Sequence, residues 1–161
     1  EMQIQPNYQN NHTFFSLVQQ INDRSFPWHY AKSEGEPEQY CHLIYDDHHF
    51  STFLNPPMLG VMQTIITDKL QAIATLRVKV NATPRNAPEQ VWHRDWNIST
   101  PSKTCILYLN DNDGYTEFKN GEKIKSVANT AVIFDTKLEH RGVPATDEER
   151  RLVLNINYFE R

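Results

Sequence analysis

Three features are scarce in this sequence: cysteine, long apolar runs and excess positive charge. The two cysteines, Cys41 and Cys105, stand singly among apolar neighbours, a pattern more typical of buried free thiols than of a disulfide framework or a thiolate metal site. No apolar stretch reaches the roughly 18 residues of a membrane span, and residues 1–10 lack the profile of a signal peptide. We therefore expect a protein of a reducing, cytoplasmic compartment without a membrane partner.

The missing basic excess argues against a nucleic-acid partner. The net charge is −4, whereas general nucleic-acid binders normally carry a basic face. Apolar residues make up 39% and charged residues 22% of the 161 residues, without a low-complexity run, which is typical of a globular protein. The length suits one domain, so we expect residues 1–161 to form a single unit without a linker or internal repeat.

The first 75 residues predict helices and short strand pieces. Residues 14–21 place apolar side chains at the spacing of one helical face, with Thr13 as a candidate cap. The clearest helix begins with Asn55 as its cap and Pro56 in its first turn. Six residues are expected along its apolar face: Met58, Met62, Ile65, Ile66, Leu70 and Ile73.

From residue 76 onward the apolar pattern changes to a period of two, which predicts strands. The expected strands are 76–82, 91–98, 103–109, 114–118, 123–127, 131–134 and 151–158. Helices followed by a run of strands exclude the alternation of a parallel α/β sheet. We therefore predict a mostly β (α+β) fold, a sandwich or barrel with the N-terminal helices packed outside it.

His93, Asp95 and His140 are the candidate metal ligands. On a strand over 91–98, His93 and Asp95 would project to one side, and Trp96 would face the other way into the core. Taken alone, a His-x-Asp pair is more often a neutral surface feature, so a third ligand is needed, and His140 ends a later strand. Two histidines and one carboxylate suit non-haem Fe(II), and zinc remains a chemical alternative.

Arg151 begins the last expected strand. Its two faces carry Arg151, Val153, Asn155 and Asn157 on one side and Leu152, Leu154, Ile156 and Tyr158 on the other. The apolar face should meet the helices, which turns Arg151 inward, where a buried guanidinium needs an anion such as a carboxylate. The alternative is a solvated cluster of Arg150 and Arg151 with Glu148 and Glu149, and this motif in isolation favours it.

With His93, Asp95, His140 and Arg151 in this order, the chain resembles an Fe(II)- and 2-oxoglutarate-dependent dioxygenase of the double-stranded β-helix (jelly-roll) fold. It is similar in particular to the prolyl-hydroxylase-like branch and to small oxygenases encoded by bacteriophages. The resemblance implies a jelly-roll core over residues 76–161, supported by residues 1–75. It also implies that the two histidines and Asp95 bind iron and that Arg151 binds the far carboxylate of 2-oxoglutarate.

Further stretches carry the resemblance. "KTCILYLND" resembles the family's "YLN" strand, which implies that Tyr108 contacts the same carboxylate, and strand alternation places Tyr108 inward. "DGYTEF" is similar to the family's "GGxTxF" turn, with Asp113 for the first glycine. Asn129 stands where glycine is common and tolerates a left-handed backbone. A loose alignment suggests Asn81 as a further 2-oxoglutarate contact.

The resemblance implies an enzyme that uses Fe(II), 2-oxoglutarate and O2, with ascorbate as a candidate addition. It would couple oxidative decarboxylation of 2-oxoglutarate to hydroxylation of a C–H bond, in the host cytoplasm if the chain is phage-encoded. Candidate substrates are a prolyl residue in a peptide, a free amino acid or another small metabolite. Two alternatives stay open: a non-catalytic jelly-roll binding or structural module, and a cupin-like metalloenzyme that does not use 2-oxoglutarate. The oligomeric state is left open.

Overall fold

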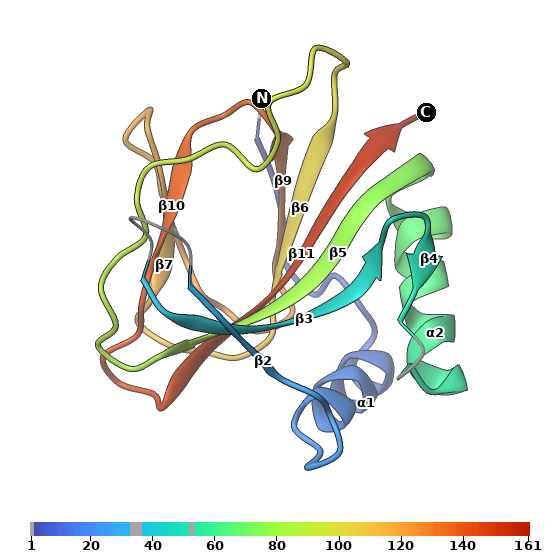
Figure 1. Cartoon of the computed structure of the whole chain (residues 1–161), viewed down its shortest axis with the longest axis horizontal. Helices are drawn as coiled ribbons and strands as arrows, with labels where there is room; N and C mark the ends of the chain where they lie inside the picture. The colour runs from blue at the N-terminus through green and yellow to red at the C-terminus, as the bar shows by residue number, and fades with distance from the viewer. Residues whose placement is uncertain (1, 33–36, 52–53) are drawn as a thin grey trace.

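Two antiparallel β-sheets face each other, and the helices pack outside the larger one (Figure 1). The computed structural model describes residues 2–32, 37–51 and 54–161. In chain order the elements are β1 (Gln3–Gln5), α1 (Asn11–Ile21), β2 (His29–Ala31), β3 (Gln39–Asp46), β4 (His49–Phe50), α2 (Pro56–Gln63), the π-helix η1 (Thr64–Lys69), β5 (Ala72–Pro84), β6 (Lys103–Tyr108), β7 (Tyr115–Phe118), β8 (Lys123–Lys125), β9 (Ala131–Asp135), β10 (His140–Val143) and β11 (Arg150–Glu160).

The strand order is that of a double-stranded β-helix, or jelly roll. The larger sheet runs β1-β9-β6-β11-β5-β3-β2, with β4 paired to β3, and the smaller sheet runs β10-β7-β8. The long central pair β5–β11 extends from Arg150 opposite Pro84 to Glu160 opposite Ala72. The predicted mostly β fold with helices outside the barrel is confirmed.

Apolar side chains form two cores, one on each face of the larger sheet. Between this sheet and the helices lie Leu17, Ile21, Met58, Met62, Ile65, Leu152, Leu154, Ile156 and Tyr158, among others. Between the two sheets lie Ile106, Tyr108, Phe118, Val132, Phe134 and Val153. The alternation predicted along β11 is therefore confirmed, and each fully buried large side chain contributes roughly 1.5–3 kcal/mol.

Asparagine caps both α-helices. The Asn55 side chain accepts a hydrogen bond from the Met58 amide at 2.9 Å, which confirms Asn55 as the cap of α2. The expected Thr13 cap is wrong. Asn10 caps α1, and its side chain accepts from the Thr13 amide, because the helix begins at Asn11, one turn before its apolar face becomes continuous.

The second helical region ends earlier than its apolar pattern suggests. After Gln63 the backbone widens into the π-helix η1, and it leaves the helix before Gln71, which has a left-handed φ of 50°. Ile73 was expected on the buried helical face and instead lies in β5 with 65% of its surface exposed. The other five residues of the predicted face are buried, since they precede the turn.

The strand expected over 91–98 is wrong. This segment is a loop, and its one bridge among the described residues joins His93 to His140 through two backbone hydrogen bonds of 3.0 Å. Pro88 and Pro101 lie on either side of it and cannot donate to a ladder. A strand that the sequence did not reveal, β10, supplies the other half of that bridge.

Several smaller expectations can be compared directly. Asn129 has the left-handed φ of 60° expected where relatives carry glycine. Cys41 and Cys105 are free, and burial raises the pKa of the Cys105 thiol to about 12. The polar stretch 32–39 is predicted from its composition to be an exposed loop, and residues 33–36 of it lie outside the described residues. No helix in the described part of the chain is long and apolar enough to cross a membrane.

Candidate active site

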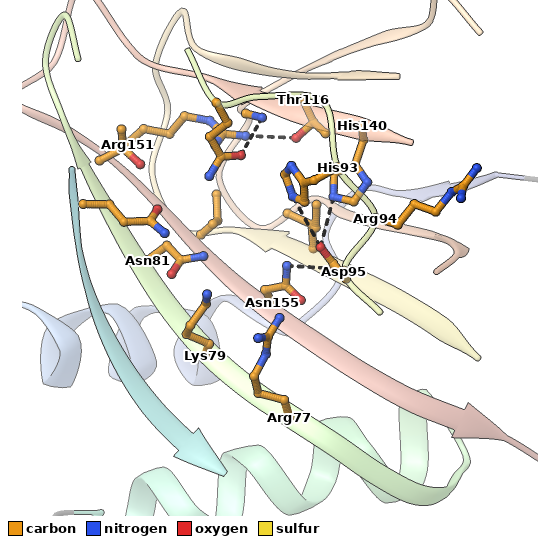
Figure 2. A pocket seen from close by; sticks show the side chains of 16 residues that line it. Arg77, Lys79, Asn81, His93, Arg94, Asp95, Thr116, His140, Arg151 and Asn155 are labelled. Atoms are coloured by element: carbon orange, nitrogen blue, oxygen red, sulfur yellow. Dashed lines mark hydrogen bonds and ion pairs between the residues drawn. The ribbon is translucent and has the colours of Figure 1, made fainter. Parts of the chain in front are cut away.

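A cavity of about 270 Å³ opens between the two sheets, on the inner face of the larger one (Figure 2). The strands β5 and β11 form its floor, and the loop after β5 together with β7 and β10 supplies the opposite wall. Its lining residues are Gln39, Arg77, Lys79, Asn81, Thr83, Gln90, His93, Arg94, Asp95, Ile106, Thr116, His140, Gly142, Arg151, Val153 and Asn155. Every site residue predicted from sequence except Tyr108 lies on this lining.

The structure brings His93, Asp95 and His140 together at one end of the cavity. Oδ1 of Asp95 lies 3.5 Å from Nε2 of His93 and 3.3 Å from Nε2 of His140. The three candidate ligand atoms lie within 4.8 Å of one another. The backbone bridge between His93 and His140 holds the loop against β10 and replaces the strand geometry expected from sequence.

Backbone carbonyls fix the orientation of both imidazoles. Nδ1 of His93 lies 2.9 Å from the Val91 oxygen, and Nδ1 of His140 lies 2.9 Å from the Leu138 oxygen. A carbonyl only accepts hydrogen bonds, so each Nδ1 carries a proton, and Nε2 is the nitrogen of each ring that is left to bind a metal. The two Nε2 atoms and one carboxylate oxygen therefore converge on one point. This donor set fits a divalent cation such as Fe(II).

The second oxygen of Asp95 is held by neutral donors. Oδ2 accepts hydrogen bonds from Nδ2 of Asn157 at 2.9 Å, Oγ1 of Thr104 at 3.2 Å and Nδ2 of Asn155 at 3.3 Å. Burial alone would raise the pKa of the Asp95 carboxyl, but the adjacent imidazoles of His140 and His93 and the amide of Asn157 outweigh burial and hold that pKa well below its usual value. Asp95 is therefore a fixed carboxylate.

Arg151 is a buried cation at the other end of the cavity. Its Nε donates to Ser126 Oγ at 3.0 Å, and its Nη2 donates to Thr116 Oγ1 at 2.9 Å. No carboxylate pairs with it among the described residues, and burial lowers its pKa. The alternative of a solvated arginine cluster is wrong, because only Arg150 faces outward, where its guanidinium lies 5.6 Å from the Trp28 ring.

Tyr108 and Asn81 occupy different positions relative to Arg151. The Tyr108 hydroxyl donates to Thr116 Oγ1 at 2.8 Å, and the Arg151 guanidinium lies 5.6 Å from the tyrosine ring. Tyr108 is fully buried behind the lining, and this burial raises its pKa although Arg151 opposes the shift. Asn81 lies on the lining opposite Val153 of β11.

Sequence reasoning missed four residues around Arg151: Thr116, Ser126, Gln90 and Gly142. The Gln90 side chain accepts from the Gly142 amide at 2.7 Å, and a Cβ on Gly142 would lie 3.1 Å from Nη1 of Arg151, so the backbone approaches the guanidinium closely there. Only Thr116 carried a signal, as the threonine of "DGYTEF". The others act through contacts between segments that are far apart in sequence.

The tryptophans beside the His-x-Asp pair flank the site. Trp96 was expected in the core, but it is half-buried, and the Arg77 guanidinium lies 5.5 Å from its ring. The centre of the Trp92 ring lies 4.4 Å from Nζ of Lys119 and 4.5 Å from the guanidinium carbon of Arg141. The core placement of Trp96 was wrong because it assumed strand alternation in a segment that is a loop.

Comparisons with known proteins agree with this geometry. A family model described as the 2OG-Fe(II) oxygenase superfamily matches residues 78–159. Among solved structures, a Pseudomonas putida prolyl-4-hydroxylase shares 17% identity at a TM-score of 0.71, over 99% of this chain and 92% of that one. No curated protein sequence matches the chain.

Two further structures show the same fold. A Trichoplax adhaerens prolyl hydroxylase, solved with a peptide fragment of the hypoxia inducible factor oxygen degradation domain, shares 14% identity at a TM-score of 0.70, covering 99% of this chain and 83% of that one. The viral collagen prolyl hydroxylase of Paramecium Bursaria Chlorella virus-1, solved with 2-oxoglutarate, shares 13% identity at a TM-score of 0.65. The match covers 98% of this chain and 96% of that one. The family match spans half of this chain and contains the three candidate metal ligands and Arg151. The chain belongs to the 2OG-Fe(II) oxygenase superfamily and is a 2-oxoglutarate-dependent dioxygenase, which uses Fe(II), 2-oxoglutarate and O2.

Proposed function

We propose that His93, Asp95 and His140 hold the Fe(II), that Arg151 binds the far carboxylate of 2-oxoglutarate, and that the enzyme hydroxylates an unactivated C–H bond. The observation that carries this assignment is the guanidinium of Arg151, which is buried and has no carboxylate partner among the described residues. Such a charge is costly unless an anion binds, and a carboxylate can accept two of its N–H groups.

The side chains divide the work between binding and orientation. Bound Fe(II) would supply the activation of O2, which protein side chains cannot perform. The Val91 and Leu138 carbonyls keep the Nε2 lone pairs of the histidines aimed at one point. Thr116 and Ser126 fix the guanidinium of Arg151, so the cosubstrate would meet a rigid cation. Tyr108 supports Thr116 from behind, and Asn81 is the second candidate contact to 2-oxoglutarate.

The substrate is a peptide or a small molecule. Similarity to prolyl hydroxylases, one of them solved with a peptide, favours a prolyl residue. The small, mostly polar cavity favours a metabolite such as a free amino acid. Two observations count against the alternative functions. A non-catalytic binding module has no need for the cluster of His93, Asp95 and His140. A cupin-like enzyme that does not use 2-oxoglutarate has no need for a buried arginine beside Tyr108.

Arg151→Gln tests the cosubstrate assignment. We expect at least about 30-fold weaker 2-oxoglutarate binding, because the far carboxylate of 2-oxoglutarate loses its cationic partner. Fe(II) binding should be retained. Anaerobic titration with 2-oxoglutarate, followed by the visible charge-transfer band, measures the first, and equilibrium dialysis with Fe(II) measures the second. Exposed Arg24→Gln is the matched control. Equal loss of both affinities, or unchanged 2-oxoglutarate binding, contradicts the assignment.

The reaction itself is measured as succinate release under air, with Fe(II) and with or without ascorbate, across peptide and metabolite libraries. A true substrate raises succinate release and gains one oxygen atom by mass spectrometry. Oxygen incorporation that does not depend on 2-oxoglutarate would count against the hydroxylase mechanism.

A further inference from the structure

Two basic side chains of the cavity have no role in the site described above: Arg77 and Lys79 of β5. They lie on the inner face of the strand, opposite Asn157 and Asn155 of β11, whereas Arg151 lies opposite Thr83. At about 3.3 Å per residue, Lys79 is roughly 13 Å further along the sheet than Thr83. Figure 2 shows Arg77 and Lys79 rising from β5 on one side of Asn155, with Arg151 and Thr116 on the other.

Arg77 is held beside the candidate metal centre. Asn157 donates to Asp95 Oδ2 at 2.9 Å and accepts from Nη2 of Arg77 at 3.2 Å, so one side chain joins the guanidinium to the metal-binding carboxylate. The Trp96 ring, 5.5 Å away, supports the guanidinium from another direction. Nε of Arg77 is buried and has no hydrogen-bond partner among the described residues. The guanidinium is thus fixed and keeps unused donor capacity.

The lining of the cavity carries more basic than acidic side chains. Asp95 is the one carboxylate among the lining residues, against Arg77, Lys79, Arg94 and Arg151. Arg94 is directed to Glu139, at 3.8 Å, and to a backbone carbonyl. Fe(II) with Asp95 and Arg151 would carry two positive charges, which the 2-oxoglutarate dianion offsets. The charge of Arg77 then has no carboxylate partner among the described residues.

Unused acceptors lie near these cations. Oδ1 of Asn81 and Oδ1 of Asn155 are buried and accept no hydrogen bond among the described residues. For Asn155 the amide orientation is fixed, because its nitrogen donates to Asp95. A ligand that satisfies this wall carries an anionic group for Arg77 and a hydrogen-bond donor nearby. The 270 Å³ cavity must also hold 2-oxoglutarate, so the part of the ligand that enters is small.

We propose that the substrate is a small amino-acid-like molecule whose free carboxylate binds Arg77, with its ammonium or hydroxyl group donating to Oδ1 of Asn155. This inference rests on the proposed function and specifies its substrate class. An α-amino acid carries an anion and a donor on the same carbon atom, which suits this wall. A peptide segment with neutral flanks would leave Arg77 unpaired, at the cost of a desolvated charge.

The test compares matched ligands that differ by one charge. Protein loaded anaerobically with Fe(II) and 2-oxoglutarate is titrated with the free amino acids and with their primary carboxamides, and binding is measured by calorimetry and by the shift of the visible band. We expect the tightest ligand to be a free acid that binds about tenfold or more tightly than its amide. Arg77→Gln should abolish this preference, Arg77→Lys should restore part of it, and Arg24→Gln should leave it unchanged.

Several outcomes overturn the proposal. Equal binding of acids and amides, full acid binding by Arg77→Gln with an unchanged melting temperature, or no binding by any free acid would each do so. A peptide blocked at both termini that binds more tightly than every acid would assign the cavity to an internal peptide segment. If Arg77→Gln loses 2-oxoglutarate as Arg151→Gln does, Arg77 belongs to the cosubstrate site. Failure of the proposed function is distinct, since the wild type would then bind neither Fe(II) nor 2-oxoglutarate.

Discussion

At the scale of single residues, Asp95 shows how one side chain serves two environments. Its Oδ1 faces two imidazole nitrogens, and its Oδ2 accepts from Asn157, Thr104 and Asn155. The amides and the hydroxyl keep the carboxylate in place without adding charge, so its negative charge stays available to a cation. A charged partner on Oδ2 would instead have competed with the metal.

Asp95→Asn should abolish tight metal binding. The carboxamide keeps the shape of the side chain, but its NH2 group must face either the two Nε2 lone pairs or the three donors on Oδ2, so it loses both the charge and the hydrogen bonds. We expect Fe(II) affinity to fall at least about 100-fold in anaerobic dialysis. Exposed Asp68→Asn removes a carboxylate elsewhere and should change nothing. Retained Fe(II) affinity would remove Asp95 from the ligand set.

At the scale of elements, β11 connects the two cores. Its outward side chains pack under the helices, and its inward row runs from Arg151 through Val153 to Asn155 and Asn157. Side chains alternate between the two faces of a strand. A single register therefore places Arg151 and the two asparagines that donate to Asp95 on the same side of the sheet. A slip of one residue would exchange them with the apolar core.

The turn before β9 attaches the N-terminal segment to the barrel. Asn129 accepts from the Gln9 amide at 2.9 Å and donates to the Gln9 carbonyl at 2.7 Å, while its backbone is left-handed. Asn129→Ala should lower the free energy of unfolding by about 2–4 kcal/mol, as it loses two buried hydrogen bonds and strains the backbone. Asn129→Gly loses only the hydrogen bonds and should cost less. Urea denaturation measures both, and an alanine variant at least as stable as the glycine variant would disprove the strain.

At the scale of the whole molecule, the N-terminal helices and the barrel share one core. Leu17, Met58 and Met62 from residues 1–75 pack with Leu154 and Ile156 of the barrel. We therefore predict that residues 1–161 unfold as a single domain in one cooperative transition. In urea, tryptophan fluorescence, which samples Trp28 and the two site tryptophans, should coincide with far-UV circular dichroism. Separate midpoints would show two independent units.

Low pH should weaken the contact between Thr146, in the loop after β10, and Asp113, in the turn before β7. Hydrogen bonds from the side chain and amide of Thr146 lower the pKa of Asp113 to about 2. Because the folded-state pKa lies below the unfolded value near 3.8, this stabilisation is present above about pH 4 and is lost as the pH falls toward 2. Melting temperatures from pH 7 to pH 2 should fall less steeply for Asp113→Asn than for Asp68→Asn. Parallel curves would contradict the contribution of Asp113.

The sequence by itself determined the features that depend on local periodicity and residue type. The alternation along 151–158 placed Arg151 inward, the period-two pattern placed Tyr108 between the sheets, and Asn129 indicated a left-handed turn. These predictions held because each depends on one strand or turn and its own burial. Ligand type and spacing, together with the resemblance to the oxygenase family, made His93, Asp95 and His140 candidate ligands before any geometry was known.

Only the tertiary structure decided what depends on contacts between distant segments. The loop at 91–98 takes its shape from the bridge between His93 and His140, so its strand alternation and the core position of Trp96 were wrong. The supports of Asp95 come from β6 and β11, and Ser126 reaches Arg151 across the barrel. Residue type carries no information on strand register or loop closure, because both are set by the partner that a segment meets after folding.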